Sequence, residues 1–162
     1  MLQPERKIYY LNIKEGRLIY KDKPYKSVKG YLKDIRLRDR EFNGETVKYW
    51  YINLLRENRE DIYAVALHYH SGVAKTILNS IASAADMSKP ITIEPYQKDG
   101  YQKAIVSSGA DKLSWKYPPA ELPAVETVQL GSERVKDASK RMLFFEQIAA
   151  DINERIKAEA NV

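Results

Sequence analysis

Two tyrosines on one side of a strand-like segment are the residues whose type and spacing most clearly suggest a binding site. Residues 47–54 alternate in character, and one side of the expected strand carries only large apolar side chains, namely Trp50, Ile52 and Leu54. Tyr49 and Tyr51 point to the opposite side, away from the core that those residues would form. A phenol ring on such a face offers a flat surface on which a nucleic-acid base can stack.

Lysine and arginine side chains lie close to these tyrosines in the sequence. Alternation on the expected strand 27–38 separates small and apolar residues from a basic and aromatic face. That face carries Lys29, Tyr31 and Lys33. The apolar phase slips by one residue beyond Leu32, which predicts a β-bulge and brings Arg36 and Arg38 onto the basic face. Cations beside stacking rings are the pattern of a surface that binds phosphates and unpaired bases.

The tyrosines also have an ordinary structural interpretation, because Tyr is a good strand former and packs well against neighbouring strands. Tyr31, Tyr49 and Tyr51 could instead lie in a subunit interface. Tyr63 and Tyr69 share a face with apolar residues of the next strand and could belong to the core.

Charge is distributed unevenly along the chain of 162 residues, whose net charge is +5. Residues 1–60 hold 15 Lys and Arg against 9 Asp and Glu, a net charge of +6, whereas residues 121–162 hold 6 against 8. The basic first third therefore suits contact with a polyanion. The absence of cysteine excludes disulfides, thiolate metal sites and a cysteine nucleophile.

Short strands broken by turns are expected over the first 117 residues, with one helix among them. The expected strands are 7–13, 17–20, 27–38, 47–54, 61–69, 91–96, 102–107 and 112–117. Apolar spacing of about 3.6 residues, after a possible N-cap at Ser71, predicts a helix that ends near Ala85. If these strands close into a barrel, Trp115 is expected to seal one end of it.

This order resembles OB-fold single-stranded DNA-binding proteins, particularly the divergent forms of bacteriophages and mobile elements. The resemblance rests on Val28 to Leu32, on Tyr49 to Leu54, on the helix that follows, and on Ile91 to Tyr96. It implies an all-β fold, a Greek-key β-barrel with one helix between its third and fourth strands. Tyr96 and Tyr101 flank the turn 97–100, which resembles the DNA-clamping loop of that fold, although they could equally be a cross-strand pair. The candidate nucleic-acid-binding residues are Lys29, Tyr31, Lys33, Arg36, Arg38, Lys48, Tyr49, Tyr51, Tyr96 and Tyr101.

Three segments are predicted from these patterns. Residues 1–117 form the OB-fold domain with an extra N-terminal hairpin, and residues 118–131 form a proline-rich linker. Residues 132–162 form an amphipathic helix whose apolar stripe includes Val135 and Met142. The helix, over residues 132–158, could pack on its own barrel, or it could pair with a second copy or a partner protein.

No catalytic motif is recognised in the sequence. His68 and His70 lack a third metal ligand at a suitable spacing, so we interpret them as strand surface and expect no enzyme, metal or other cofactor. Residues 1–6 lack the apolar core of a signal peptide, and no apolar run of about 18 residues could span a membrane, so we expect a soluble, cytoplasmic protein. The predicted function is sequence-tolerant binding of single-stranded DNA, with RNA possible, in replication or recombination. The alternative is a structural module that assembles with other proteins.

Overall fold

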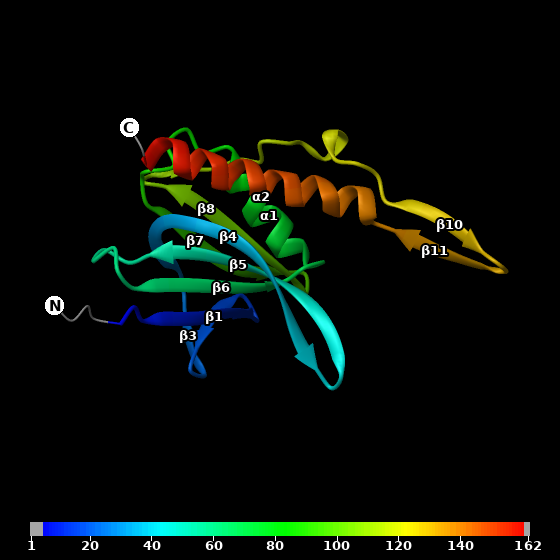
Figure 1. Ribbon diagram of the computed structural model, residues 1–162, viewed down its shortest axis with the longest axis horizontal. Helices are drawn as coiled ribbons and strands as arrows, with labels where there is room; N and C mark the ends of the chain where they lie inside the picture. Colours follow the sequence, from blue (N-terminus) through cyan, green and yellow to red (C-terminus); the bar gives the residue numbers. More distant parts are fainter. Residues whose placement is uncertain (1–4, 161–162) are drawn as a thin grey trace.

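Alternating polar and apolar residues build one large mixed β-sheet, on which two helices pack (Figure 1). The computed structural model describes residues 5–160; residues 1–4 and 161–162, the outer ends of the first and last predicted segments, lie outside the described residues. The strands of the large sheet are β1 (Ile8–Lys14), β2 (Arg17–Tyr20), β3 (Lys23–Tyr25), β4 (Val28–Phe42), β5 (Glu45–Leu55), β6 (Ile62–His68), β7 (Ile91–Lys98), β8 (Tyr101–Ser108) and β9 (Asp111–Lys112). Their spatial order is β3-β2-β1-β6-β5-β4-β7-β8-β9, and β1 runs parallel to β6.

The predicted mostly β architecture, with one helix inside the run of strands and one near the C-terminus, is confirmed. Helix α1 (Gly72–Ala82) begins after the predicted cap, because the Ser71 hydroxyl oxygen accepts a hydrogen bond from the Ala74 N–H at 3.2 Å. It ends three residues earlier than predicted, at Ala82. The strand expected at 112–117 is wrong beyond Lys112, the last residue of β9.

The bulge predicted in β4 is present. The register of β4 against β5 shifts between Leu32 and Asp34, so Lys33 is the extra residue. Before the bulge, β4 pairs with β7 through Val28–Gly30, and it pairs with β5 from Tyr31 onward. One bent strand therefore joins the two parts of the sheet.

A closed barrel is not observed within residues 5–160. The strands of the predicted barrel lie in the order β6-β5-β4-β7-β8, but the sheet does not pair β6 with β8. β6 pairs instead with β1, so the N-terminal hairpin extends the sheet at this edge. The turn of that hairpin reaches the other part of the sheet, where the Gly16 N–H donates to Oε1 of Gln102 at 2.8 Å.

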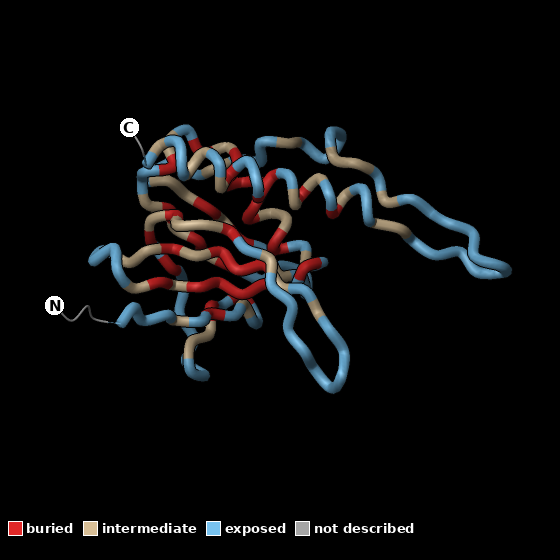
Figure 2. Tube along the Cα trace, viewed as in Figure 1, coloured by how far each residue is buried: buried red, intermediate tan, exposed pale blue. Residues whose placement is uncertain are grey.

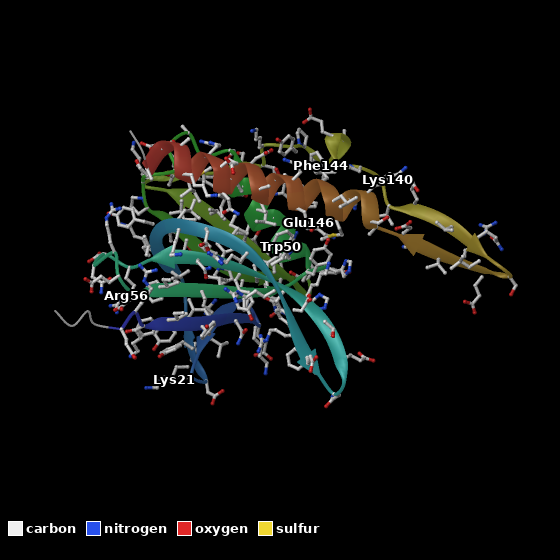
Figure 3. All side chains as sticks on the ribbon, viewed as in Figure 1. Lys21, Trp50, Arg56, Lys140, Phe144 and Glu146 are labelled. Atoms are coloured by element: carbon white, nitrogen blue, oxygen red, sulfur yellow. The ribbon has the colours of Figure 1, made fainter. Side chains whose placement is uncertain are left out.

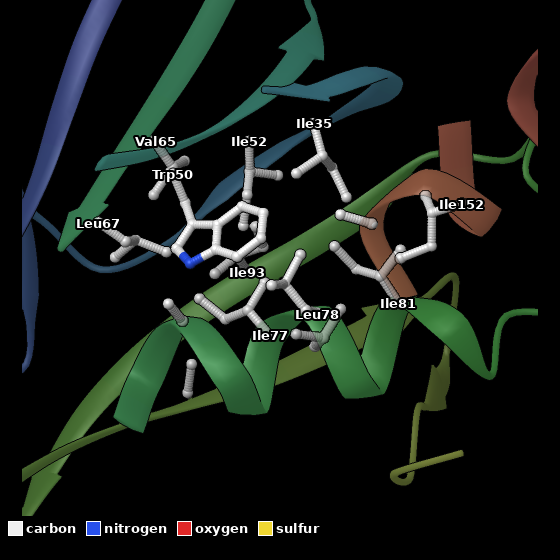
Figure 4. Close-up of a cluster of buried hydrophobic side chains, with 14 of the residues drawn as sticks. Ile35, Trp50, Ile52, Val65, Leu67, Ile77, Leu78, Ile81, Ile93 and Ile152 are labelled. Carbon is white, nitrogen blue, oxygen red and sulfur yellow. The ribbon is translucent and has the colours of Figure 1, made fainter. Parts of the chain in front are cut away.

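The core lies between the sheet and α1, as the strand alternation predicted. Trp50, Ile52 and Leu54 are at most 1% exposed. Trp50 and Ile52 face the apolar stripe of α1 that contains Ile77 and Ile81 (Figure 4). The Trp50 indole N–H donates to the Tyr69 carbonyl at 3.1 Å, and the two rings stack 5.6 Å apart. Tyr69 therefore belongs to the core side of the molecule.

The segment between the sheet and the last helix differs from the prediction. The predicted linker contains a short 3₁₀ turn, η1 (Pro119–Glu121), and it is followed by a hairpin of β10 (Glu126–Leu130) and β11 (Glu133–Asp137). Val135, predicted on the helical stripe, lies opposite Val128 in this hairpin. β-branched residues favour strands, and Gly131 adopts a positive φ of 62° in the turn, so local preference overrides the helical spacing. The predicted helix start at Ser132 is therefore wrong.

Helix α2 (Ser139–Ala160) packs on its own sheet, which is one of the two predicted arrangements for its apolar face. Met142, Phe145, Ile148, Ala149 and Ile152 are all buried there. The Tyr69 hydroxyl donates to the Glu146 carboxylate at 2.8 Å, and Figure 3 labels Glu146 above Trp50. None of the helices within residues 5–160 is both long and apolar enough to cross a membrane.

Asn153 of α2 completes the backbone hydrogen bonding of β4 just after the bulge. The Ile35 N–H donates to Oδ1 of Asn153, and Nδ2 of Asn153 donates to the Ile35 carbonyl, both at 2.8 Å. The side-chain amide thus takes the place of a neighbouring strand. Ile35 itself is 3% exposed, so its backbone has little access to water as a substitute partner.

We predict that Asn153→Ala lowers the free energy of unfolding by about 2–4 kcal/mol, because it leaves a buried N–H and a buried carbonyl without a partner. Urea denaturation followed by circular dichroism measures the change. The control is Gln147→Ala on the same helix, whose side chain bonds only to the exposed Asp151. Gln147→Ala should lower the free energy of unfolding by less than about 0.5 kcal/mol. Equal effects of the two substitutions would contradict the assigned role of Asn153.

Candidate nucleic-acid interface

The sheet has a second face, turned away from the core, and we call the part formed by β4, β5, β6 and β1 the outer face. Its side chains follow from the register: Arg36 lies opposite Tyr51, Tyr51 opposite Ala66, and Ala64 opposite Tyr10. Because side chains alternate across a strand, the residues that build the core and those of the outer face come from the same strands. Basic and aromatic residues collect on the outer face.

A hollow of about 500 Å³ lies on the outer face, and we call it the basic hollow. Four cations and two tyrosines are among its lining residues: Arg6, Lys33, Arg36, Arg38, Tyr10 and Tyr51. Lys33 faces this side because it follows the buried Leu32, and the shifted register after the bulge brings Arg36 and Arg38 there as well. The structure thus brings together four of the predicted site residues.

Asp34 moderates the positive charge beside the basic hollow. Its carboxylate lies 3.1 Å from both the Lys33 ammonium and the Arg36 guanidinium, and it accepts a hydrogen bond from Nδ2 of Asn53 at 2.7 Å. Partial burial opposes ionisation, but the hydrogen bonds from Asn53, Lys33 and Arg36 outweigh it and hold the pKa of Asp34 below its usual range. Arg38 forms no ion pair with any of the described residues, so its charge is free to meet a phosphate.

The two tyrosines of the basic hollow differ in their exposure. Tyr51 is 9% exposed and packs with Ile62, Ala64 and Ala66. Tyr10 is 56% exposed and meets the Tyr51 ring edge-on, with centroids 6.3 Å apart. The exposed ring available for stacking in this hollow is therefore that of Tyr10, and Tyr51 supports it from below.

A second hollow, of about 510 Å³, lies where the outer face ends, between the strands, the start of α1 and the β7–β8 turn, and we call it the hairpin hollow because that turn borders it. Tyr49, His68 and Tyr101 are among its lining residues. The two hollows are neighbours along β6, since Ala64 lines the first and Ala66 the second. The Tyr49 ring contacts the Arg40 guanidinium, 4.9 Å from its centroid, whereas Tyr101 is 72% exposed.

Four of the predicted site residues lie elsewhere. The Tyr31 ring is covered by the Arg59 guanidinium at 4.0 Å, and the Lys48 ammonium lies 5.5 Å from the Tyr69 ring. Lys29 lines a separate pocket on the other side of β1, and Tyr96 lines a hollow beside β8 and β9. The ten predicted residues therefore do not form one continuous surface.

Sequence reasoning missed Arg6, Tyr10 and His68 as members of this face. The alternation of β1 was visible, but the side to which Tyr10 points depends on the parallel pairing of β1 with β6, which no local pattern indicates. Trp115 is 41% exposed, so it does not have the predicted role of sealing an end of a barrel. The rings of His68 and His70 lie 6.0 Å apart, and residues 5–160 contain no cluster of three or more His, Cys, Asp or Glu suited to a metal ion.

Comparison of this chain with protein-family models, with curated proteins and with solved structures finds no match. The function therefore has to be argued from the site itself.

The low pKa of Asp34 predicts a specific dependence of stability on pH. Its folded-state pKa lies below that of the unfolded chain, so its contribution is present above about pH 4 and is lost as the pH falls through the folded-state pKa. We expect Asp34→Asn to be about 1–2 kcal/mol less stable than the wild type at pH 7. This difference in the free energy of unfolding should become smaller below about pH 4, where Asp34 of the wild type becomes protonated. Urea denaturation across this pH range provides the measurement.

The control for this series is Asp39→Asn, an exposed carboxylate on the same strand. Its stability should differ little from that of the wild type across the pH range. If the difference in free energy of unfolding between the wild type and Asp34→Asn stays constant from pH 7 to below pH 4, the Asp34 charge does not contribute to stability.

Proposed function

We propose that the protein binds single-stranded DNA, without sequence preference, along the outer face of β1, β4, β5 and β6. The observation that carries the proposal is the basic hollow, where four cations surround an exposed tyrosine ring. Cations attract the phosphates of any sequence, and a tyrosine face accepts any base. Duplex DNA fits this arrangement poorly because its bases are already stacked and paired.

The path of the strand in this proposal follows β6 from the basic hollow to the hairpin hollow. Lys33, Arg36 and Arg38 contact phosphates at one end, and Tyr10 stacks on a base there. Tyr49 and Tyr101 receive the bases at the other end. RNA offers the same phosphates and bases, and its discrimination from DNA would depend on contacts with the 2′-hydroxyl.

An OB-fold is the architecture that we propose for this sheet. The strand order β6-β5-β4-β7-β8 and the position of α1 between β6 and β7 support it, with β1 occupying the edge of β6. The same fold presents nucleic-acid sites on its strands in many proteins. A role in DNA replication or recombination, in a phage or mobile element, would follow, since both processes expose single strands.

An interaction module is the second candidate, and the β10–β11 hairpin favours it. This hairpin extends away from the sheet, and its ten strand residues are exposed or nearly so (Figures 1 and 2). Leu130 and Val135 on it are 61% and 41% exposed. An isolated two-stranded hairpin is only marginally stable in water, so contact with another protein would stabilise it.

Fluorescence anisotropy of a labelled oligo-dT tests the primary proposal. We expect binding that weakens as salt rises from about 50 to 200 mM and that a duplex competitor of equal length does not displace. Arg38→Gln should reduce the slope of log affinity against log salt by about 0.7, the value for one lost contact with a single strand. Tyr10→Ala should weaken binding about tenfold at every salt concentration, because one stacked ring is lost.

Matched controls are Arg134→Gln on the exposed β10–β11 hairpin and Tyr96→Ala, which lies outside both hollows. Both should bind oligo-dT as the wild type does. No binding at low salt, or equal losses from the controls and the outer-face variants, would reject the proposal in favour of the interaction module. Tighter binding of oligo-U than of oligo-dT would assign the surface to RNA.

A further inference from the structure

A third hollow lies on the opposite side of β1 from the basic hollow. It has a volume of about 370 Å³, and we call it the four-tyrosine pocket because four rings line it: Tyr9 of β1, Tyr20 of β2, Tyr25 of β3 and Tyr63 of β6. Leu11, Leu18 and Val28, all buried, form its apolar floor. Adjacent residues of a strand point to opposite faces, so Tyr9 lines this pocket and Tyr10 the basic hollow.

Three of the four rings support one another, and the fourth is open. Tyr9 lies 5.3 Å from Tyr20 and 5.5 Å from Tyr63, with tilted ring planes in both pairs. Tyr25 lies on the outermost strand of the sheet, is 47% exposed, and forms no ring pair with the described residues. A flat ligand can therefore lie between the Tyr25 face and the three fixed rings.

Cations surround this pocket, although its floor is apolar. Lys29 is one of the lining residues, and none of the described lining residues is acidic. The Lys21 ammonium lies 5.5 Å from the Tyr20 ring, and the Lys7 ammonium 4.7 Å from the Tyr9 ring. Lys21 and Arg56, labelled in Figure 3, lie on the side of the molecule away from α2.

Arg56 holds the Tyr9 side of the pocket in place. Its guanidinium lies 5.2 Å from the Tyr9 ring and 5.6 Å from the Tyr63 ring, and it donates a hydrogen bond to the Tyr9 hydroxyl at 3.0 Å. It also pairs with Asp61 at 3.5 Å, so part of its charge is already balanced. Lys29 and Lys21 form no ion pair with the described residues, which leaves their charges for a ligand.

We propose that the four-tyrosine pocket binds a single nucleotide, with the base against the tyrosine rings and the phosphate at Lys29. The volume lies within the range of small-molecule sites and suits one base with its sugar. An inorganic anion would make no use of four rings, and a neutral aromatic compound would make no use of the cations. Nucleotides combine a flat ring system with negative charge, which is the chemistry that this lining recognises.

Two sources could supply this ligand: a free nucleotide in solution, or the terminal nucleotide of a DNA strand whose other nucleotides lie on the outer face. Only the second source depends on the proposed function. The two sites share no lining residue, so a variant can remove one and leave the other.

Isothermal titration calorimetry of the full chain with dAMP is the first experiment. We expect one dAMP per chain, no measurable binding of adenosine or of deoxyribose 5-phosphate at the same concentration, and a tenfold or greater loss of affinity for both Tyr25→Ala and Lys29→Gln. Both side chains are exposed, so the variants should unfold at the temperature of the wild type. The controls are Tyr101→Ala and Lys112→Gln, exposed residues outside the pocket, which should bind dAMP normally.

A 5′-phosphorylated oligo-dT distinguishes the two sources. The pocket receives the end of a strand if dAMP does not bind but Tyr25→Ala and Lys29→Gln each weaken the binding of this oligonucleotide. In that case Tyr101→Ala should weaken its binding independently. If Tyr25→Ala and Lys29→Gln change neither dAMP nor oligonucleotide binding, the proposal is overturned, whatever happens at the outer face. A change in sedimentation coefficient alone in these variants would also overturn it, since the pocket would then contact another protein.

Discussion

The bulge at Lys33 is the constraint on which the arrangement of this molecule depends. It bends β4 two residues into its long ladder with β5, just after its short ladder with β7 ends, so that one strand joins both parts of the sheet. Gly30 allows the close approach at this bend, because a Cβ there would lie 2.6 Å from the Leu55 carbonyl oxygen. Beyond the bulge, Asn153 of α2 satisfies the backbone of Ile35. The bend, the last helix and the core are thus fixed by one short segment.

The same bulge determines the chemistry of the outer face. Without the extra residue, the alternation that buries Leu32 would turn Ile35 and Leu37 outward and Arg36 inward. With it, Ile35 and Leu37 stay on the core side, and Arg36 and Arg38 reach the basic hollow. Core and candidate site therefore use alternate residues of the same strands, and a change of register would disrupt both together.

β1 separates two aromatic surfaces of different character. On one side, Tyr10 stands exposed among cations over a broad hollow, and on the other, Tyr9 is held by Arg56 within a smaller pocket. Most residues that line the two surfaces belong to the basic first third of the chain, whereas α2 and the β10–β11 hairpin belong to the segment with a net negative charge. This division would orient a polyanion toward the strands and leave the hairpin for other contacts.

Sequence alone determined the features that depend on local alternation and spacing. The buried face of β5, the bulge in β4, the cap of α1 and the cationic character of the early strands were all predicted, because each follows from residues within a few positions of one another. Tertiary structure alone decided which strands became neighbours. The pairing of β1 with β6 exposed Tyr10, the packing of α2 on the sheet buried Phe145, and the hairpin replaced the expected start of the helix at Ser132. These outcomes depend on contacts between residues that lie far apart in the chain. The pattern of residues within one segment does not indicate the free energy of such contacts.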